Sequence, residues 1–302
     1  MLKPNYPVYV ISKGRADSNL TAKFLQQDKV PYKIVVEPQE AEAYAEACGK
    51  KNILSLPFSN LGLGSIPARN WVWEHAKASG AKRHWILDDN IRSIKRWYNG
   101  MRIKCDSGPA FKAIEDFTDR YENIAISGMN YAMFAYTKKP PFHLNSHVYS
   151  CLLIRNDLPH RWRGRYNEDA DLCLQVLADS WCTVLVNVFV AEKMQTMAMT
   201  GGNTDQLYKE DGRTEMARSL ERQWPYVVTT KRRFGRAQHV IKDQWKRFDT
   251  PLIRRKDIDW NNLGQNEYGL GLSQVAEEVK SEQVQNLLKE KNATTRKTTK
   301  TS

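Results

Sequence analysis

Short apolar segments alternate with segments of helical periodicity along the first ninety residues. The apolar segments have the length of buried strands and cover residues 8–11, 32–36, 53–56 and 84–87. Helical patterns fill the intervals, over residues 20–27, 39–48 and 67–78. A strand–helix–strand order of this kind is typical of right-handed crossovers between parallel strands. The alternation therefore predicts an α/β fold with a mostly parallel central sheet.

The pattern becomes less regular after Ile91. We expect further helices over residues 110–122, 169–178 and 213–222. We expect further strands over residues 124–127, 131–136, 148–155 and 182–190. The chain turns polar near its end, where Lys, Thr and Asn dominate. We predict one domain over 1–250, a C-terminal extension over 251–288 and a disordered basic tail over 289–302.

Composition excludes several classes of protein. The chain has 302 residues, of which 41% are hydrophobic and 26% are charged, so it is not a disordered, collagen-like or coiled-coil chain. Its longest strongly apolar stretch, 184–191, is interrupted by Asn187, so we expect no membrane span. The N-terminal segment is too polar for a signal peptide. The five cysteines form no CxxC pair, which favours ordinary thiols in a reducing cytosol.

The positive charge is concentrated in one segment. The formal net charge is +12, and residues 231–256 contain ten Lys or Arg and two Asp. A basic block of this kind usually meets a polyanion such as DNA. We name four of its residues as candidate DNA contacts: Lys231, Arg232, Arg233 and Arg236. The alternative is a solvated face without a partner.

Polar residues follow each of the four predicted N-terminal strands. They are Ser12, Lys13, Gly14 and Arg15 after the first, Glu37 after the second, the Gly-rich loop 57–65 after the third, and Asp88, Asp89 and Asn90 after the fourth. In open α/β sheets, ligands bind at the carboxyl ends of the strands. Cations, acids and a Gly-rich loop on one rim predict a site for a metal-bound phosphate ester.

The Gly-rich loop leads directly into a predicted helix. Helix N-termini attract phosphate groups. Arg69 and Asn70 lie in the first helical turn, from which they could reach the rim. The segment matches neither a P-loop nor a GxGxxG fingerprint, so it supports neither a Walker-type NTPase nor a Rossmann dehydrogenase.

Two acidic clusters carry the candidate chemistry. Asp88 and Asp89 suit Mg²⁺ or Mn²⁺, which are held by one or two carboxylates and by substrate phosphates. The alternative is that Asn90 caps a helix over 91–97, with the acids complementing its dipole. Glu168 and Asp169 open a second predicted helix, where one could act as a general base or both could simply stabilise the helix N-terminus.

Six segments together resemble the TET-associated glycosyltransferases, which are GT-A-fold enzymes found mainly in bacteriophages. The segments are PVYVISKGRADS, VVEPQE, LPFSNLGLGSIPARNWVWEHA, RHWILDDNI, RWRGRYNEDADLCLQVL and GGNTDQLY. The resemblance extends from about Pro7 to about His239. It implies a GT-A-like domain that transfers a sugar from a nucleotide sugar, with a UDP-sugar as the expected donor. The implied acceptor is 5-hydroxymethylcytosine in DNA, and the implied location is the cytoplasm of a bacterial host.

The resemblance also implies roles for the acidic clusters. Asp88, Asp89 and Asn90 stand where GT-A enzymes carry a DxD metal motif, with Asn in the third position. Glu168 and Asp169 stand where inverting enzymes often carry an acid pair that includes the base. Some GT-A enzymes place a C-terminal His on the metal, and His239 is the candidate for that role.

These roles combine into one hypothesis of mechanism. The donor would be bound by residues from all four strand ends: Ser12, Lys13, Arg15, Glu37, Arg69, Asn70 and Asp88. Asp169 would take the proton of the acceptor hydroxyl, Glu168 would orient a substrate, and a single displacement would invert the anomeric carbon. The hydroxymethyl group lies on the major-groove edge of cytosine, so the base could react in place or flipped out. Transfer to cell-envelope glycans and a non-enzymatic DNA-binding role are the competing functions.

Overall fold

The computed structural model describes residues 2–98, 101–135, 140–194, 212–233 and 235–264. The chain divides into two compact units, Met1–Ile258 and Asp259–Ser302. Nearly all described residues belong to the first unit, and the account below concerns that unit. The predicted limits of the domain, the extension and the tail stay predictions.

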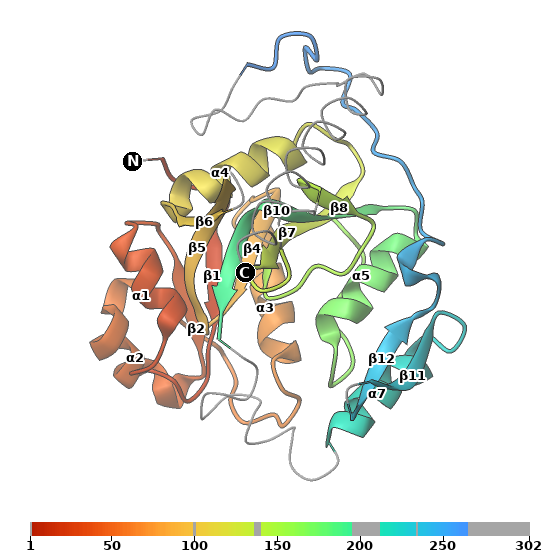
Figure 1. Ribbon diagram of the computed structural model, residues 1–302. Helices are drawn as coiled ribbons and strands as arrows, with labels where there is room; N and C mark the ends of the chain where they lie inside the picture. Colours follow the sequence, from red (N-terminus) through yellow and green to blue (C-terminus); the bar gives the residue numbers. More distant parts are fainter. Residues whose placement is uncertain (1, 99–100, 136–139, 195–211, 234, 265–302) are drawn as a thin grey trace, which may run out of the picture. The chain divides into compact units, whose positions relative to one another are not determined.

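The N-terminal half of the central sheet consists of parallel strands (Figure 1). Its order is β3 (Ile53–Ser55), β2 (Lys33–Val36), β1 (Val8–Ile11) and β4 (Arg83–Asp88), with every pairing parallel. The four predicted strands therefore share one sheet, and their carboxyl ends meet at one edge. This confirms the α/β prediction.

The other half of the sheet is mixed. Its strands are β9 (Cys151–Arg155), β7 (Ile124–Tyr131), β10 (Cys182–Lys193), β5 (Ile91–Tyr98) and β6 (Met101–Lys104), with β8 (Phe142–Leu144) beside β10. β9 is antiparallel to both β4 and β7, whereas β7 and β10 are parallel. β5 and β6 form an antiparallel ribbon at the edge next to β10.

One alternative and one local prediction are wrong. Residues 91–97 form strand β5 rather than a helix, because the long strand β10 offers its edge for antiparallel pairing. Asn90 therefore caps no helix. The predicted strand 131–136 is also absent as such: β7 ends at Tyr131, and the chain turns back where the amides of Phe134 and Ala135 donate to the Tyr131 carbonyl.

Helices cover both faces of the sheet (Figure 1). The six described α-helices are α1 (Leu20–Gln27), α2 (Ala41–Cys48), α3 (Ile66–Ala78), α4 (Ser107–Thr118), α5 (Glu168–Ala178) and α7 (Gly212–Gln223). Three short 3₁₀ turns accompany them: η1 (Pro38–Glu40), η2 (Lys50–Asn52) and η3 (Lys242–Trp245). Side chains alternate along β4, so Trp85 packs on Phe111 of α4 while Ile86 joins a buried cluster with α3 and α5.

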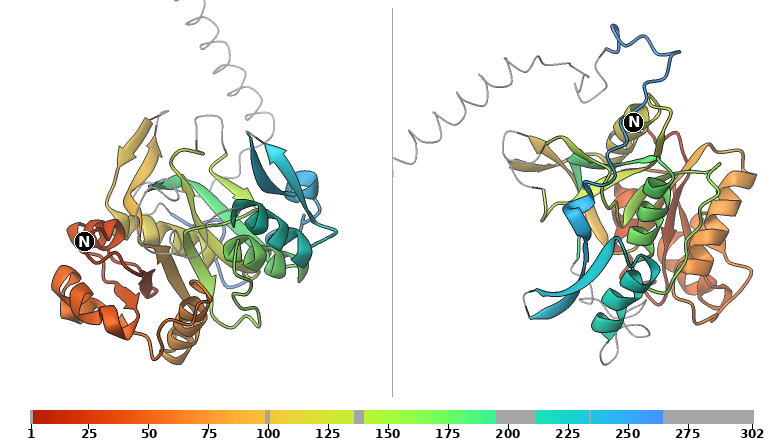
Figure 2. Two further views of the ribbon diagram at one scale, coloured as in Figure 1. Left: turned by 90° about the horizontal axis from the view of Figure 1, so that it is seen from below. Right: turned by 90° about the vertical axis from the view of Figure 1, so that its right-hand side faces the viewer.

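A separate hairpin follows α7. It consists of β11 (Val228–Arg233) and β12 (Arg236–Ile241), and its base packs on α5 and α7 through Leu174, Leu220 and Val228. Both views of Figure 2 show this ribbon and the β5–β6 ribbon projecting from the same side of the molecule. Among the described residues, no helix is both long and apolar enough to cross a membrane.

Candidate active site

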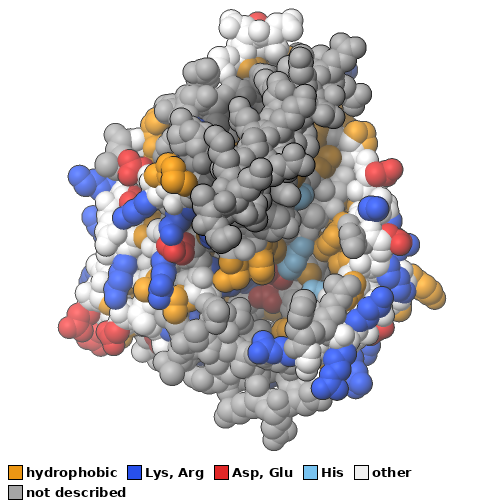
Figure 3. All heavy atoms as spheres, viewed as in Figure 1, with side chains coloured by type: hydrophobic (Ala, Val, Ile, Leu, Met, Phe, Trp, Pro, Cys, Tyr) orange, Lys and Arg blue, Asp and Glu red, His pale blue; other side chains and the backbone are white. Residues whose placement is uncertain are grey.

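A cavity of about 1040 Å³ lies at the carboxyl ends of β1, β2 and β4. Ser12, Glu37 and Asp88 line it from these strand ends, and Glu168 and Asp169 line it from the start of α5. Figure 3 shows acidic side chains inside a hollow on this face, with hydrophobic side chains and histidines beside them. The parallel strands thus bring the predicted rim together as expected.

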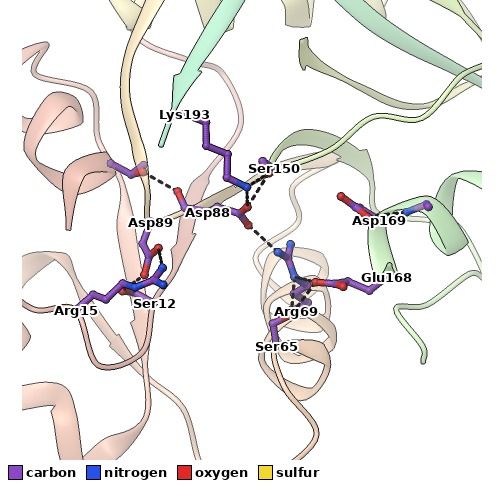
Figure 4. A network of polar contacts seen from close by, with 12 residues as sticks. Ser12, Arg15, Ser65, Arg69, Asp88, Asp89, Ser150, Glu168, Asp169 and Lys193 are labelled. Carbon is purple, nitrogen blue, oxygen red and sulfur yellow. Dashed lines mark hydrogen bonds and ion pairs between the residues drawn. The ribbon is translucent and has the colours of Figure 1, made fainter. Parts of the chain in front are cut away.

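Asp88 lies between two cations (Figure 4). Its Oδ1 accepts a hydrogen bond from Arg69 Nη2 at 2.8 Å, and its Oδ2 accepts from Lys193 Nζ at 2.8 Å and Ser150 Oγ at 2.7 Å. Burial alone would raise the pKa of Asp88, but the charges of Lys193 and Arg69 lower it below its ordinary value. Asp88 is therefore a carboxylate at neutral pH.

Asp89 points away from Asp88 into the first loop. Its Oδ2 accepts from Ser12 Oγ at 2.6 Å, and its Oδ1 accepts from Arg15 Nη1 at 2.7 Å. Ser12 and Arg15 are further held by Tyr44, whose hydroxyl lies 2.7 Å from Ser12 Oγ and 2.9 Å from the Arg15 amide. Burial raises the pKa of Asp89, against the lowering effect of these partners. Asp89 thus fastens the loop that follows β1.

The predicted metal ligands do not fit a divalent cation as their side chains lie. Both oxygens of Asp88 and both oxygens of Asp89 already accept hydrogen bonds from cations or hydroxyls. Of the three predicted ligands that follow β4, Asn90 alone has a buried oxygen, Oδ1, without a partner among the described residues. In the part of the chain that the structure describes, no group of three or more His, Cys, Asp or Glu is placed to hold a metal ion.

Arg69 joins the two acidic clusters. From α3, its guanidinium reaches Asp88 and also lies 3.6 Å from Glu168, measured from Nε to Oε1. Its plane is fixed by the Trp162 ring, 4.7 Å from the guanidinium carbon, and by Ser65 Oγ at 3.1 Å from Nε. Its Nη1 is buried and has no hydrogen-bond partner within the described residues. That nitrogen is a buried donor without a partner on a residue that lines the cavity.

Asn70 is not brought to the cavity. Its side-chain amide donates to the Trp162 carbonyl at 2.8 Å and accepts from the Trp162 amide at 3.0 Å. Successive side chains of a helix point in different directions, so Arg69 and Asn70 do not both face the site. The predicted donor contact of Asn70 therefore has no support in this geometry.

Glu168 and Asp169 begin α5 at the wall opposite Asp89 (Figure 4). Asn167 precedes them with a φ of 55° and makes no side-chain cap, because its amide donates to the Met216 carbonyl instead. Asn167 therefore does not cap α5 through its side chain. Glu168 accepts from Ser65 Oγ at 3.0 Å, and Asp169 Oδ1 lies 3.2 Å from His147 Nε2.

The two acids differ in proton affinity. Burial raises the pKa of Glu168, and the nearby charge of Asp169 raises it further against Arg69. Burial acts the same way on Asp169, but His147 and Arg69 together outweigh it and hold the pKa of Asp169 below its ordinary value. The pair exchanges protons as a unit, with Glu168 the more basic member.

The first loop and Glu37 line the opposite part of the cavity. Lys13 Nζ lies 2.8 Å from Glu37 Oε2, and Glu37 Oε1 accepts from the Asn60 amide at 3.2 Å. Burial opposes ionisation of Glu37, but Lys13 and these hydrogen bonds lower its pKa. Glu37 is therefore an ionised acceptor at the end of β2.

The basic block lies partly on the hairpin beside the cavity. Lys231 and Arg232 lie on β11, and both are exposed. Arg236 and His239 of β12 line the cavity. The structure describes the backbone of Arg233 but not its side chain. Burial lowers the pKa of His239 to about 4, so its imidazole is neutral at pH 7. His239 is thus near the acids, although its predicted metal role stays a prediction.

Several residues at the site are missing from the sequence-based prediction. They are Ser65, Tyr131, His147, Tyr149, Ser150 and Lys193. Lys193 ends β10, far from any motif, and reaches Asp88 because β10 pairs with β5, where Lys193 lies opposite Ile91, just beyond Asp88 in the chain. A polar residue just beyond a predicted strand was the available signal for Lys193. The segment GGNTDQLY, residues 201–208, which contributes to the resemblance, lies outside the described residues.

Comparisons with known proteins bear on this site. Residues 6–202 match the family described as TET-Associated Glycosyltransferase. No curated protein matches the chain. A solved structure of a protein from Desulfovibrio desulfuricans G20, named a nucleotide-diphospho-sugar transferase, is similar with 11% identity and a TM-score of 0.34, over 58% of this chain and 76% of that chain. Since the family match contains β1, the Gly-rich loop, Asp88 and the start of α5, the chain belongs to the TET-associated glycosyltransferase family and is a glycosyltransferase with an α/β fold.

Proposed function

We propose that this glycosyltransferase moves a sugar from a nucleotide sugar to 5-hydroxymethylcytosine in DNA, in the cytoplasm of a bacterial host. One observation carries the proposal. Arg69 spans Asp88 at a strand end and Glu168 at a helix start, and its buried Nη1 has no partner among the described residues. A buried arginine donor without a partner, on a residue that lines the cavity, suits a phosphate oxygen.

The donor would lie across the strand ends. Glu37, with Lys13 beside it, offers an ionised acceptor for hydroxyl or amide groups of the nucleoside. Arg69 and Lys193 flank Asp88 and would face the diphosphate. Burial would lower the pKa of Lys193, but Asp88 and Tyr131 raise it above its ordinary value, so Lys193 stays charged. Both cations then stabilise the negative charge that develops on the leaving diphosphate.

The Mg²⁺ or Mn²⁺ predicted from the sequence does not suit Asp88 and Asp89 as their side chains lie. A divalent cation at Asp88 would lie against the positive charges of Lys193 and Arg69, which already bond its two oxygens. We therefore assign no step of the reaction to a metal ion.

The acceptor would be activated at the start of α5. Its hydroxyl oxygen attacks the anomeric carbon, the bond from that carbon to the diphosphate oxygen breaks, and the nucleoside diphosphate leaves. The hydroxyl proton passes to Asp169, and Glu168 orients the acceptor or the sugar. A carboxylate within hydrogen-bond reach of the hydroxyl suffices for this role. Attack from the side opposite the leaving group inverts the configuration.

Two basic ribbons support DNA as the acceptor. The β11–β12 ribbon carries the predicted contacts Lys231 and Arg232, which are both exposed. The β5–β6 ribbon projects on the same side (Figure 2) and adds further cations. These are Arg92, Lys95, Arg96, Arg102 and Lys104. Cations on both sides of a cavity suit the phosphates on both sides of one modified nucleotide.

Mass spectrometry of nucleosides tests the proposal. Duplex DNA with 5-hydroxymethylcytosine, and the same DNA with 5-methylcytosine, would be incubated with the protein and a panel of nucleotide sugars. We expect a hexose-sized mass increase on the hydroxymethylated nucleoside only. Replacing Lys231, Arg232 and Arg233 with Glu should weaken DNA binding and spare donor binding. Absence of the product with every donor, or transfer only to a glycan acceptor, would refute DNA as the substrate.

A further inference from the structure

An aromatic wall runs along the cavity from Asp88 toward Asp169. We use this name for Phe134, Tyr131, Tyr149 and His147, which all line the cavity. Successive ring centroids lie 5.8 Å, 4.3 Å and 4.9 Å apart in that order. The wall ends at His147, 3.2 Å from the carboxylate of Asp169. It therefore borders the place where the acceptor hydroxyl must lose its proton.

The two central rings of the wall are held by hydrogen bonds, and its Phe134 end is exposed. The Tyr149 hydroxyl donates to the buried Asn130 Oδ1, and the Tyr131 hydroxyl bonds Ser150. Phe134 and Met133, in the turn after β7, are 50% and 52% exposed although both line the cavity. Large apolar side chains exposed beside a charged cavity mark a surface that a ligand covers.

The acids at the end of the wall are recessed. The side chains of Glu168 and Asp169 are only 17% and 27% exposed. A general base must come within about 3 Å of the hydroxyl it deprotonates. A cytosine stacked in a duplex presents its 5-substituent inside the major groove, so only a projecting carboxylate could reach it. These carboxylates line the cavity instead of projecting from the surface, so a base that stays stacked in the duplex cannot reach them.

We propose that the acceptor cytosine leaves the base stack and lies against the aromatic wall, with its hydroxymethyl group toward Asp169. This inference rests on the proposed function. The cavity, about 1040 Å³, is at the upper end of the usual range for small-molecule sites, which leaves room for a nucleoside beside the donor. Stacking on aromatic rings is how proteins hold unstacked bases. The basic ribbons would hold the flanking phosphates.

Three oligonucleotide substrates separate a flipped base from a stacked one. Each contains one 5-hydroxymethylcytosine: paired with guanine, opposite an abasic site, or in single-stranded DNA. Because flipping must break the pair and the stack, we expect kcat/KM to rise about tenfold or more when the partner base is removed. A 2-aminopurine next to the target should brighten when the protein binds the paired duplex. Equal rates on paired and abasic duplexes, without brightening, would overturn the inference.

A variant of the wall provides the second readout. Phe134→Ala should raise KM for DNA between about fivefold and a hundredfold, the range of base–aromatic stacking, and leave nucleotide-sugar affinity unchanged. Phe134→Tyr should restore most of the loss. Tyr226→Ala is the matched control, since Tyr226 is an aromatic residue, 84% exposed, away from the cavity lining. If Phe134→Ala behaves like Tyr226→Ala, the wall holds no base. If no hydroxymethylated substrate reacts at all, the proposed function fails first and the inference falls with it.

Discussion

Replacing Lys193 with methionine tests the arrangement around Asp88 most directly. Lys193 Nζ donates to Asp88 at 2.8 Å, to Ser150 at 2.7 Å and to Tyr131 at 3.1 Å, and its side chain is only 11% exposed. Methionine retains the apolar stem and removes the charge. Breaking a fully buried ion pair costs about 3–5 kcal/mol. Asp88 is 23% exposed and keeps Arg69 as a partner, so we expect a smaller loss, about 1–3 kcal/mol.

The functional effect should be larger than the effect on stability. A charged hydrogen bond to a phosphate contributes about 1.5–3 kcal/mol, so the affinity for the nucleoside diphosphate should fall about tenfold to a hundredfold. Urea denaturation gives the free energy of unfolding, and calorimetry with UDP and other nucleoside diphosphates gives the affinity. Both are measured on the full chain.

Lys95→Met is the control for this variant. Lys95 also pairs with an acid, Glu192, at 2.7 Å, but on the more exposed β5–β10 surface. A surface pair of this kind contributes about 0–1 kcal/mol. If Lys193→Met matches Lys95→Met in both stability and diphosphate affinity, the reasoning about Asp88 is refuted.

Three further predictions concern the base, the metal and a buried acid. Asp169→Asn should lower kcat about 10²- to 10⁴-fold with donor affinity little changed. The roles of Asp169 and Glu168 would be reversed if Glu168→Gln is inactive, Asp169→Asn is active, and the rate falls on the acid side with an apparent pKa above the ordinary value for Glu. Because Lys193 and Arg69 occupy Asp88, activity should survive excess EDTA; loss of activity that Mn²⁺ restores would establish the metal site predicted from sequence. Burial raises the pKa of Glu115 to about 7, so the folded protein retains a proton that the unfolded chain loses, and the free energy of unfolding should fall between about pH 4.5 and pH 7. Glu115→Gln should remove that slope, at most about 1.4 kcal/mol per pH unit, and an unchanged slope in urea titrations would contradict the assignment.

The order of local patterns is sufficient to predict the half of the sheet that makes the rim. Parallel strands joined by helices can be arranged in few ways, and all of those ways bring the carboxyl ends together. The strand pattern therefore predicts that Ser12, Glu37 and Asp88 share one rim, and all three line the cavity. Local patterns do not settle the structure of residues 91–97, because the spacing of their apolar residues fits a helix as well as a strand. Long-range pairing with the edge of β10 makes this segment a strand.

The partners of each charge depend on the folded chain. Local sequence shows that Asp88 is acidic, but not that Lys193, Arg69 and Ser150 surround it, because these residues lie on three separate elements. The aromatic wall joins the turn after β7 with the segment before β9 for the same reason. Residue type and order are local properties, whereas proton affinity, ion pairing and cavity shape arise from residues that meet only after the sheet has assembled. The acids could thus be identified from the sequence, but their partners and relative basicity required the tertiary structure.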